Sequence, residues 1–270
     1  MDKNCIICGN SLSLLMNDKI LDKYSIDYYL CNNCKCIQTE TPYWLQEAYS
    51  SSIALSDTGI MSRNIDVCKK LTMILKRYFN PASKVVDYGG GYGILTRMLR
   101  DNGIDAYWSD KYTENLLARG FEYDGHSFVD AIVAFEVIEH LPNPLEEIKE
   151  ILSKTNCFIF SVSILKKFDY KSNKEWWYFS PETGQHIFFP SKNTLQYIAK
   201  ALNVTYFNLW GLQILSRNIR FSKIRNLDLF FHYIWQGINY RLQSKKRFIP
   251  KTSEDRLLLI NQQIISKENG

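Results

Sequence analysis

The sequence predicts an α/β fold in which helices cover both faces of a mostly parallel sheet, with a cysteine-rich module before it and a helical extension after it. Between residues 84 and 216, strand-length apolar segments alternate with helical patterns, which is typical of parallel strands joined by helices. Two Cys-x-x-Cys pairs precede this region, and a mixture of cationic and aromatic residues follows it. We therefore expect three parts, at residues 1–41, 42–216 and 217–270.

The composition limits the classes of protein to consider. The 270 residues, 46% of them hydrophobic, are enough for one large domain with small additions. The formal net charge of +5 is mild, and it does not indicate a nucleic-acid partner. No signal-peptide pattern and no apolar run of ~18 residues occurs, so we expect a cytoplasmic protein. In a reducing compartment, the seven cysteines favour metal ligation over disulfides.

The first part is predicted from its two Cys-x-x-Cys pairs, which are 22 residues apart. Such pairs can supply four thiolates to one tetrahedral Zn²⁺. Because four thiolates leave no open position for a substrate, we expect a structural zinc ribbon. Cys36 is an alternative ligand to Cys34, and incidental reduced thiols are the other alternative. The expected ligands are Cys5, Cys8, Cys31 and Cys34.

The central region opens with a helical pattern over about 45–79, which Pro81 ends. Hydrophobic period, apolar runs and glycine positions mark the elements that follow. The expected strands are 84–89, 104–110, 128–137, 157–164, 204–210 and 212–216, of which the last two form an antiparallel pair. The expected helices are 94–103, 113–120, 141–154 and 193–203.

The stretch VVDYGGGYGILTRML predicts a ligand site after the first of these strands. Glycines allow positive φ and a close approach of backbone to ligand, and the following helix offers free N–H groups to an anionic group. A dinucleotide fingerprint would need a glycine where Ile94 stands. Instead, the third glycine comes one residue early, and an acid precedes the set as D-x-G-x-G-x-G. Its members are Asp87, Gly89, Gly91 and Gly93.

This pattern resembles motif I of class I S-adenosylmethionine-dependent methyltransferases, and further matches follow in order over residues 84–215. Asp110 stands 19 residues after Gly91, where the family's acid bonds the two ribose hydroxyls of the cofactor. The stretch FVDAIVAFEVIEHLPNP resembles the family's fourth-strand block, which lines the cofactor. The resemblance implies a Rossmann-like seven-stranded sheet, S-adenosylmethionine as cofactor and methyl transfer. The implied cofactor-binding residues are Asp87, Tyr88, Gly89, Gly91, Gly93, Asp110, Lys111, Phe135 and Glu136.

The stretch EWWYFSPETGQHIFFPSKNTLQYIAKAL resembles a block of bacterial methyltransferases that lie among surface-polysaccharide genes, and the cysteine module also occurs in sugar methyltransferases of that group. The resemblance implies O-methylation of a small acceptor, a nucleotide-linked or phosphorylated sugar such as a capsule precursor. A hydroxyl acceptor must lose its proton, and His186 is the first candidate base. The alternative is a structural histidine in a capping loop. The catalytic candidates are His186, Tyr178, Glu136 and His140.

The stretch EVIEH raises a metal-dependent alternative. If a helix begins at Glu136, then Glu136, Glu139 and His140 share one face, and with His186 they make a site for Mg²⁺ or Mn²⁺. A similar E-x-x-E-H motif binds a divalent ion in small-RNA 2′-O-methyltransferases and occurs in ubiquinone-pathway O-methyltransferases. There the metal polarises the accepting hydroxyl. Many metal-free relatives also carry EVIEHL, so both interpretations stay open.

Two other classes and the last part complete the predictions. An RNA methyltransferase would use the cysteine module as an RNA-binding ribbon, but lysines and acids are nearly balanced there. A non-catalytic binding module would not need the complete cofactor pattern. Residues 217–270 predict a helix packed on the domain or on a second subunit of a homodimer. Peripheral contact with an anionic membrane surface is the alternative for this part.

Overall fold

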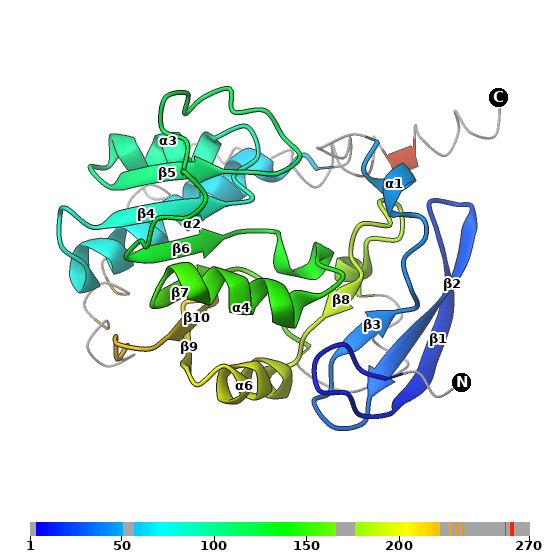
Figure 1. Ribbon diagram of the computed structural model, residues 1–270. Helices are drawn as coiled ribbons and strands as arrows, with labels where there is room; N and C mark the ends of the chain where they lie inside the picture. The colour runs from blue at the N-terminus through cyan, green and yellow to red at the C-terminus, as the bar shows by residue number, and fades with distance from the viewer. Residues whose placement is uncertain are drawn as a thin grey trace.

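The computed structural model describes residues 4–50, 57–165 and 176–221, together with Leu227, Phe231, Ile234, Leu257, Ile260 and Asn261. These residues form two sheets (Figure 1). One has six strands and is flanked by helices, and the other has four strands, three of which belong to the N-terminal module. The predicted helical extension at 217–270, with its membrane or subunit contacts, lies largely outside the described residues. Within the described ranges, none of the helices has the length and apolarity that crossing a membrane requires.

The six-stranded sheet has the order β5-β4-β6-β7-β10-β9. Its first four strands are parallel, and β10 runs antiparallel between β7 and β9. This arrangement confirms the expected parallel sheet with an antiparallel closing pair. The strands are β4 (Lys84–Tyr88), β5 (Asp105–Ser109), β6 (Ala131–Ala134), β7 (Cys157–Phe160), β9 (Thr205–Leu209) and β10 (Leu212–Ser216).

Helices cover both faces of this sheet. The helices are α1 (Leu45–Ala48), α2 (Ile60–Tyr78), α3 (Ile94–Asp101), α4 (Pro144–Lys154) and α6 (Lys192–Ala201), with the 3₁₀ turns η1 (Ile138–His140) and η2 (Trp177–Phe179). Successive strand residues point to opposite faces. Accordingly, Val86 and Ile132 share a buried cluster with α4 and α6, whereas Val85 and Val133 share another with α2 and α3. The helical pattern expected over about 45–79 corresponds to α1 and α2.

The expected seventh strand is not formed by the described residues. Beside the edge strand β5, Glu122 makes a single parallel bridge with Trp108. The Trp108 N–H donates to Phe121 O, and the Tyr123 N–H donates to Trp108 O, each at 2.8 Å. The Asp124 carboxylate then accepts two backbone N–H bonds from the residues that follow it. This turn ends the pairing after one bridge, so the seventh position carries a loop.

The helix expected over 113–120 is wrong, because this segment is an irregular loop. The Asp110 carboxylate accepts the N–H of Thr113 at 2.8 Å, and the Leu116 N–H donates to Tyr92 O at 3.2 Å. The Leu117 N–H, which a helix over 113–120 would pair with Thr113 O, also donates to Tyr92 O, at 3.0 Å. Tertiary bonds override the local helical pattern here.

The N-terminal module is an antiparallel sheet that a distant strand completes. It contains β1 (Leu12–Ile20), β2 (Tyr24–Cys31) and β3 (Ile37–Thr39), and β3 also pairs with β8 (Phe188–Phe189). Buried residues of the module belong to the same cluster as buried residues of α4 and α6. The module and the helix-flanked sheet thus share one hydrophobic core. The boundary expected between residues 41 and 42 stays a prediction.

Candidate functional site

The loop between β4 and α3 holds three glycines at positive φ, Gly89 (+70°), Gly91 (+52°) and Gly93 (+86°). A Cβ atom at Gly89 would lie 2.5 Å from a methyl carbon of Val137, and one at Gly93 would lie 2.9 Å from the side-chain oxygen of Asn115. A Cβ atom at Gly91 would meet none of the described atoms within 4 Å. Packing excludes side chains at Gly89 and Gly93, whereas the described atoms leave space beside the Gly91 Cα atom that a ligand could approach.

Asp87 supports this loop from below. It is buried, and its Oδ2 accepts both the backbone N–H of Thr96 at 3.1 Å and the Thr96 hydroxyl at 2.8 Å. Burial raises the pKa of Asp87 to about 6, and the two bonds from Thr96 oppose that rise. The carboxylate therefore ties the end of β4 to the first turn of α3. It positions the glycine loop, and its Oδ2 is occupied by Thr96.

Asp110 lies at the end of β5 and is bonded to the same loop. Its Oδ2 accepts the Gly91 N–H at 2.9 Å, and its Oδ1 accepts the N–H groups of Tyr112 and Thr113 at 2.8 Å each. The Trp108 indole N–H also donates to Gly91 O, at 2.7 Å. The carboxyl ends of the neighbouring parallel strands β4 and β5 are thus joined, which is where open α/β sheets bind ligands.

The side chains of Tyr88 and Tyr112, beside these two strand ends, have different surroundings. Tyr88 donates its hydroxyl to Glu147 of α4, so this hydroxyl is already paired. Tyr112 is 84% exposed next to Asp110, and the Lys111 ammonium lies 5.5 Å from the centre of its ring. Tyr112 therefore offers an aromatic face beside the acid that the resemblance assigns to the ribose.

Glu136 follows β6 in a left-handed conformation, with φ of +56°. Its backbone N–H donates to Ser161 Oγ at 3.0 Å, and the Ser161 hydroxyl donates to Glu136 Oε1 at 2.9 Å. Its Oε2 lies 3.8 Å from Arg63 Nε. No α-helix begins at Glu136, because the chain forms the short 3₁₀ turn η1 over Ile138–His140 instead. The prediction that Glu136, Glu139 and His140 share one helix face is therefore wrong. Phe135, beside it, packs partly buried against the α2–α3 side of the sheet.

Glu139, His140 and His186 form a cluster at the same end of the sheet. Their carboxylate oxygen and ring nitrogens lie within 4.8 Å of one another, and the two imidazole centres are 4.9 Å apart. The Tyr178 hydroxyl donates to Glu139 Oε1 at 2.5 Å. Glu139 Oε2 is buried and has no hydrogen-bond partner among the described residues. The structure thus brings together three of the four predicted metal ligands and leaves out Glu136.

Burial controls the charges in this cluster. It raises the pKa of Glu139 to about 8, and the nearby Glu136 carboxylate adds to the rise. Burial also lowers the pKa of His140 to about 3, with a contribution from His186, and it lowers the pKa of His186 itself. Near neutral pH the cluster therefore favours neutral imidazoles and a neutral Glu139 unless a cation is present.

The Nδ1 hydrogen bond of His186 fixes which nitrogen of that ring carries the proton. His186 Nδ1 lies 2.6 Å from Tyr178 O. A carbonyl oxygen can only accept, so Nδ1 carries the proton and Nε2 of the neutral ring has a free lone pair. His140 Nδ1 lies 2.6 Å from the Tyr49 hydroxyl. An Nε2 lone pair suits either a general base or a metal ligand.

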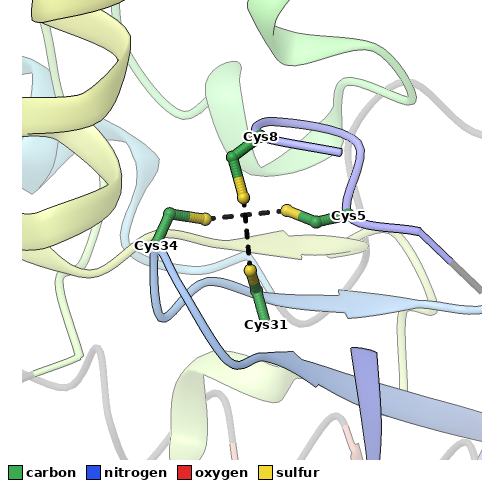
Figure 2. A group of neighbouring side chains, drawn as sticks. All are labelled: Cys5, Cys8, Cys31 and Cys34. Atoms are coloured by element: carbon green, nitrogen blue, oxygen red, sulfur yellow. Dashed lines mark hydrogen bonds between the residues drawn. The ribbon is translucent and has the colours of Figure 1, made fainter. Parts of the chain in front are cut away.

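The four cysteines of the two Cys-x-x-Cys pairs converge, and Figure 2 shows their sulfur atoms pointing toward a common centre. Cys5 Sγ lies 3.6 Å from Cys34 Sγ, and Cys8 Sγ lies 3.4 Å from Cys31 Sγ. Tetrahedral Zn–S bonds of ~2.3 Å imply sulfur–sulfur separations of about 3.8 Å, so these thiols fit a zinc ion. Cys36 Sγ is buried 3.5 Å from Cys5 Sγ as a fifth thiol beside the four.

Three polar residues of this site lie outside the sequence-based predictions, namely Thr96, Ser161 and Tyr49. Each bonds to a predicted residue, respectively Asp87, Glu136 and His140. A hydroxyl in the first turn after the glycine loop is a weak local signal for Thr96. The partner of Tyr49 is distant in the sequence, and no local pattern indicates it.

Comparisons with known proteins show the family of this chain. A family model described as Methyltransferase domain matches residues 62–208, more than half of the chain. No curated protein matches the sequence. Similar solved structures include three methyltransferases at low identity. One is magnesium protoporphyrin IX methyltransferase from Synechocystis PCC 6803 with bound SAH, at 16% identity and a TM-score of 0.42, and the match covers 63% of this chain and 90% of that chain. Another is an O-methyltransferase family protein from Burkholderia thailandensis, at 10% identity and a TM-score of 0.40, with 64% of this chain and 67% of that chain covered. The third is mitomycin 7-O-methyltransferase, at 11% identity and a TM-score of 0.43, with 64% of this chain and 59% of that chain covered.

The family match spans the glycine loop, Asp110 and the Glu139–His140–His186 cluster. The glycine loop, Asp110 and Glu139 follow the neighbouring parallel strands β4, β5 and β6, respectively. The chain therefore belongs to the methyltransferase domain family and is an S-adenosylmethionine-dependent methyltransferase.

Proposed function

We propose that this methyltransferase O-methylates a sugar hydroxyl on a nucleotide-linked or phosphorylated precursor of a bacterial capsule or other surface polysaccharide. One observation carries the assignment of a hydroxyl acceptor. Val137 packs directly against Gly89 of the glycine loop, and Val137 precedes Glu139 by two residues in the sequence. The glycine loop therefore lies close to the cluster that holds His186, the proposed neutral base. Donor and acceptor groups would therefore meet across a short distance.

The sugar class rests on the resemblance of residues 175–202 to polysaccharide-associated methyltransferases, and exposed aromatic surface supports it. Trp177 is 64% exposed, and its ring lies 5.4 Å from the ring of Tyr178. Trp176 packs against Phe179 and Phe189 instead and contributes to the core. Trp177 is thus the residue available to stack on a sugar ring beside the cluster.

S-adenosylmethionine, when bound, supplies a methyl group on a sulfonium for an in-line displacement. Gly91 and Asp110 would hold this cofactor, with Tyr112 beside its adenosine part. His186 Nε2 would accept the proton of the acceptor hydroxyl, and the Nδ1 bond to Tyr178 O would keep the ring oriented. A positioned base contributes ~10²–10⁴-fold, and alignment of the reactants contributes ~7–11 kcal/mol.

Asp110→Ala should weaken cofactor binding. The substitution removes the acceptor for the ribose hydroxyls and for the Gly91 N–H, so we expect a loss of ~1–3 kcal/mol in binding free energy, measured by calorimetry with S-adenosylmethionine. Asp130→Ala is the matched control, because Asp130 accepts the Lys84 N–H at the opposite end of the strands. Equal affinities of the Asp110→Ala variant and the unchanged protein would contradict the assignment.

His186→Ala should lower turnover by ~10²-fold or more while leaving cofactor affinity nearly unchanged. The base must be neutral, and burial lowers its pKa, so activity should fall on the acid side only below the ordinary histidine midpoint of ~6.5. A pH–rate profile of methyl transfer measures this, with the exposed His126→Ala as control. Wild-type turnover of the His186→Ala variant would return this histidine to a structural role.

A second candidate function is divalent-metal-dependent methylation of a hydroxyl on RNA or another small acceptor. The buried Oε2 of Glu139 has no hydrogen-bond partner in the described part of the chain and lies beside two imidazoles, which favours this function because a cation would supply the missing partner. Glu139, His140 and His186 would hold Mg²⁺ or Mn²⁺. The ion would act as a Lewis acid on the accepting hydroxyl.

Glu139→Gln separates the two candidates. Without a metal, the neutral amide replaces a carboxyl group that already prefers its neutral form, so turnover should stay within a few-fold of the unchanged protein. With a metal, the variant should lose ~10²-fold, and chelation of the unchanged protein should abolish activity that Mn²⁺ or Mg²⁺ restores. The exposed Glu146→Gln is the control.

The cysteine cluster supports one structural zinc ion per chain. Protein purified without chelator should contain one zinc by elemental analysis, and Cys8→Ser should lose most of it. Cys68→Ser should retain the metal, because Cys68 is a buried thiol outside the cluster. Because metal binding contributes folding free energy, Cys8→Ser should also speed proteolysis of the first 40 or so residues. Zinc-free protein with an intact module would contradict the proposal.

A further inference from the structure

We propose that the N-terminal cysteine module, together with the segment 42–48 that follows it, is the positioning element of the acceptor side of the site. In this proposal the module holds residues 180–189, and thereby His186, while the cofactor loop is held separately. The inference rests on the proposed function for the role of His186, and it adds a division of labour between two supports.

Residues 180–189 are bonded at successive points to the module and to the segment 44–48 that follows it. The Leu21 N–H donates to Pro181 O at 2.9 Å, and the Trp44 indole N–H donates to Gly184 O at 2.8 Å. The Gln185 amide donates to the backbone carbonyl that ends α1, at 2.8 Å. The β3–β8 pairing completes the set. His186 thus lies between anchored neighbours on both sides.

Ile187 connects the module to the catalytic cluster directly. Its carbonyl accepts the N–H of Thr39 in β3 at 3.0 Å, and its own N–H donates to Glu139 O at 2.9 Å. One residue therefore bridges the module strand and the loop that carries Glu139 and His140. A shift of β3 would move the backbone next to His186.

The contact between segment and module is close. Gly184 has φ of +62°, and a Cβ atom there would lie 3.1 Å from Leu21 Cγ and 3.3 Å from Ile20 Cδ1. Trp44 is 1% exposed beneath this glycine. The segment therefore lies against the turn between β1 and β2 with no intervening space, and module packing limits where it can lie.

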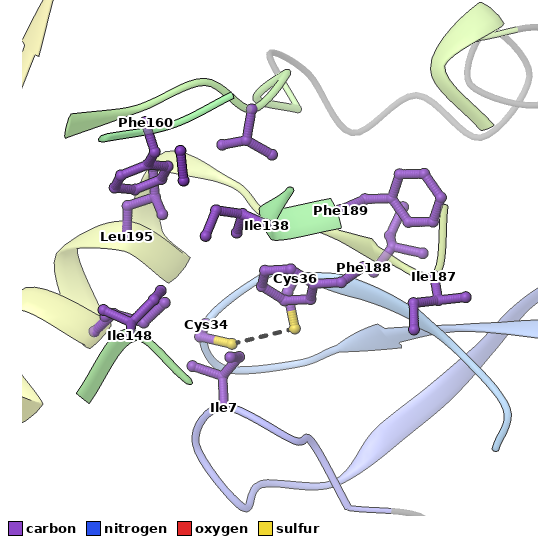
Figure 3. Packing of buried hydrophobic residues seen from close by; sticks show 14 of the residues in the cluster. Ile7, Cys34, Cys36, Ile138, Ile148, Phe160, Ile187, Phe188, Phe189 and Leu195 are labelled. Atoms are coloured by element: carbon purple, nitrogen blue, oxygen red, sulfur yellow. Dashed lines mark hydrogen bonds between the residues drawn. The ribbon is translucent and has the colours of Figure 1, made fainter. Parts of the chain in front are cut away.

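The same attachment reaches the cysteine cluster. The hydroxyls of Ser191 and Thr194, at the start of α6, both donate to Cys34 O at 2.9 Å. Figure 3 shows Phe188 and Phe189 packed in one buried cluster with Cys36 and Ile138, the residue before Glu139. A metal that orders the Cys34 loop would therefore also order the chain on the far side of His186.

The cofactor loop has a different support. Two residues of β5 hold it: Ser109 O accepts the Gly89 N–H at 2.8 Å, and the Trp108 indole N–H donates to Gly91 O at 2.7 Å. Among the bonds that hold each loop of the site, one joins an indole N–H to a glycine carbonyl, from Trp44 on the acceptor side and from Trp108 on the cofactor side. This symmetry supplies a matched pair of variants.

The test compares Trp44→Phe with Trp108→Phe in the full chain, by amide hydrogen exchange, cofactor calorimetry and steady-state kinetics. Trp44→Phe should speed exchange about 5-fold or more in residues 180–189, lower kcat by a similar factor and leave cofactor affinity within 2-fold. Trp108→Phe should speed exchange in residues 89–93 and weaken cofactor binding, with residues 180–189 unchanged. Removal of zinc by a chelator should reproduce the exchange pattern of Trp44→Phe.

Two outcomes would overturn the proposal: unchanged exchange in residues 180–189 of Trp44→Phe, or an equal increase in both loops. Gln185→Ala, which removes one bond at the surface of the segment, replaces Trp44→Phe if that variant does not fold, with the same expected exchange and the same contrary results. Hydrogen exchange is measured without a methyl acceptor, so this readout does not depend on the proposed function. If the proposed function is wrong, the unchanged protein will show no methyl transfer to the proposed acceptor, and the exchange result still stands.

Discussion

The antiparallel pairing of β3 with β8 is the contact on which the arrangement of the site depends. It joins the N-terminal module to the segment that follows Tyr178, and the Ile187 N–H in that segment donates to Glu139 O. Without it, the four-stranded sheet loses its last strand and the two parts lose their common core. The module is thus part of the architecture that surrounds the reaction, because its strand edge and its buried residues are completed by the methyltransferase part of the chain.

Burial of polar groups then determines what chemistry the cluster can perform. A carboxyl group with no exposed surface favours its neutral form, and two neighbouring imidazoles disfavour protonation for the same reason. The bond from Tyr178 satisfies one oxygen of Glu139 and leaves the other without a described partner. Such a site can either work with neutral groups, as a base would, or take up a cation that restores the charged carboxylate.

The glycine loop illustrates how one motif serves several physical needs. Gly89 and Gly93 make room for Val137 and Asn115, whereas Gly91 leaves space beside its Cα atom while its N–H is bonded to Asp110. Asp87, the acid of the motif, accepts two hydrogen bonds from Thr96 and so holds the start of helix α3. Close packing of the loop against β5 and η1 therefore prepares a rigid edge at the carboxyl ends of the strands, and preorganisation of this kind lowers the cost of aligning a bound donor.

The sequence by itself determined the alternation of strands and helices, the glycine loop, the acid after β5 and the convergence of two cysteine pairs, because each depends on hydrophobic period or on short fixed spacings. Only the tertiary structure decided the left-handed turn at Glu136, the loss of the 113–120 helix and the reduction of the seventh strand to one bridge. It also decided that Tyr49 meets His140 and that β8 completes the module. These features arise from hydrogen bonds and packing between residues far apart in the chain, and local patterns carry no information about such partners.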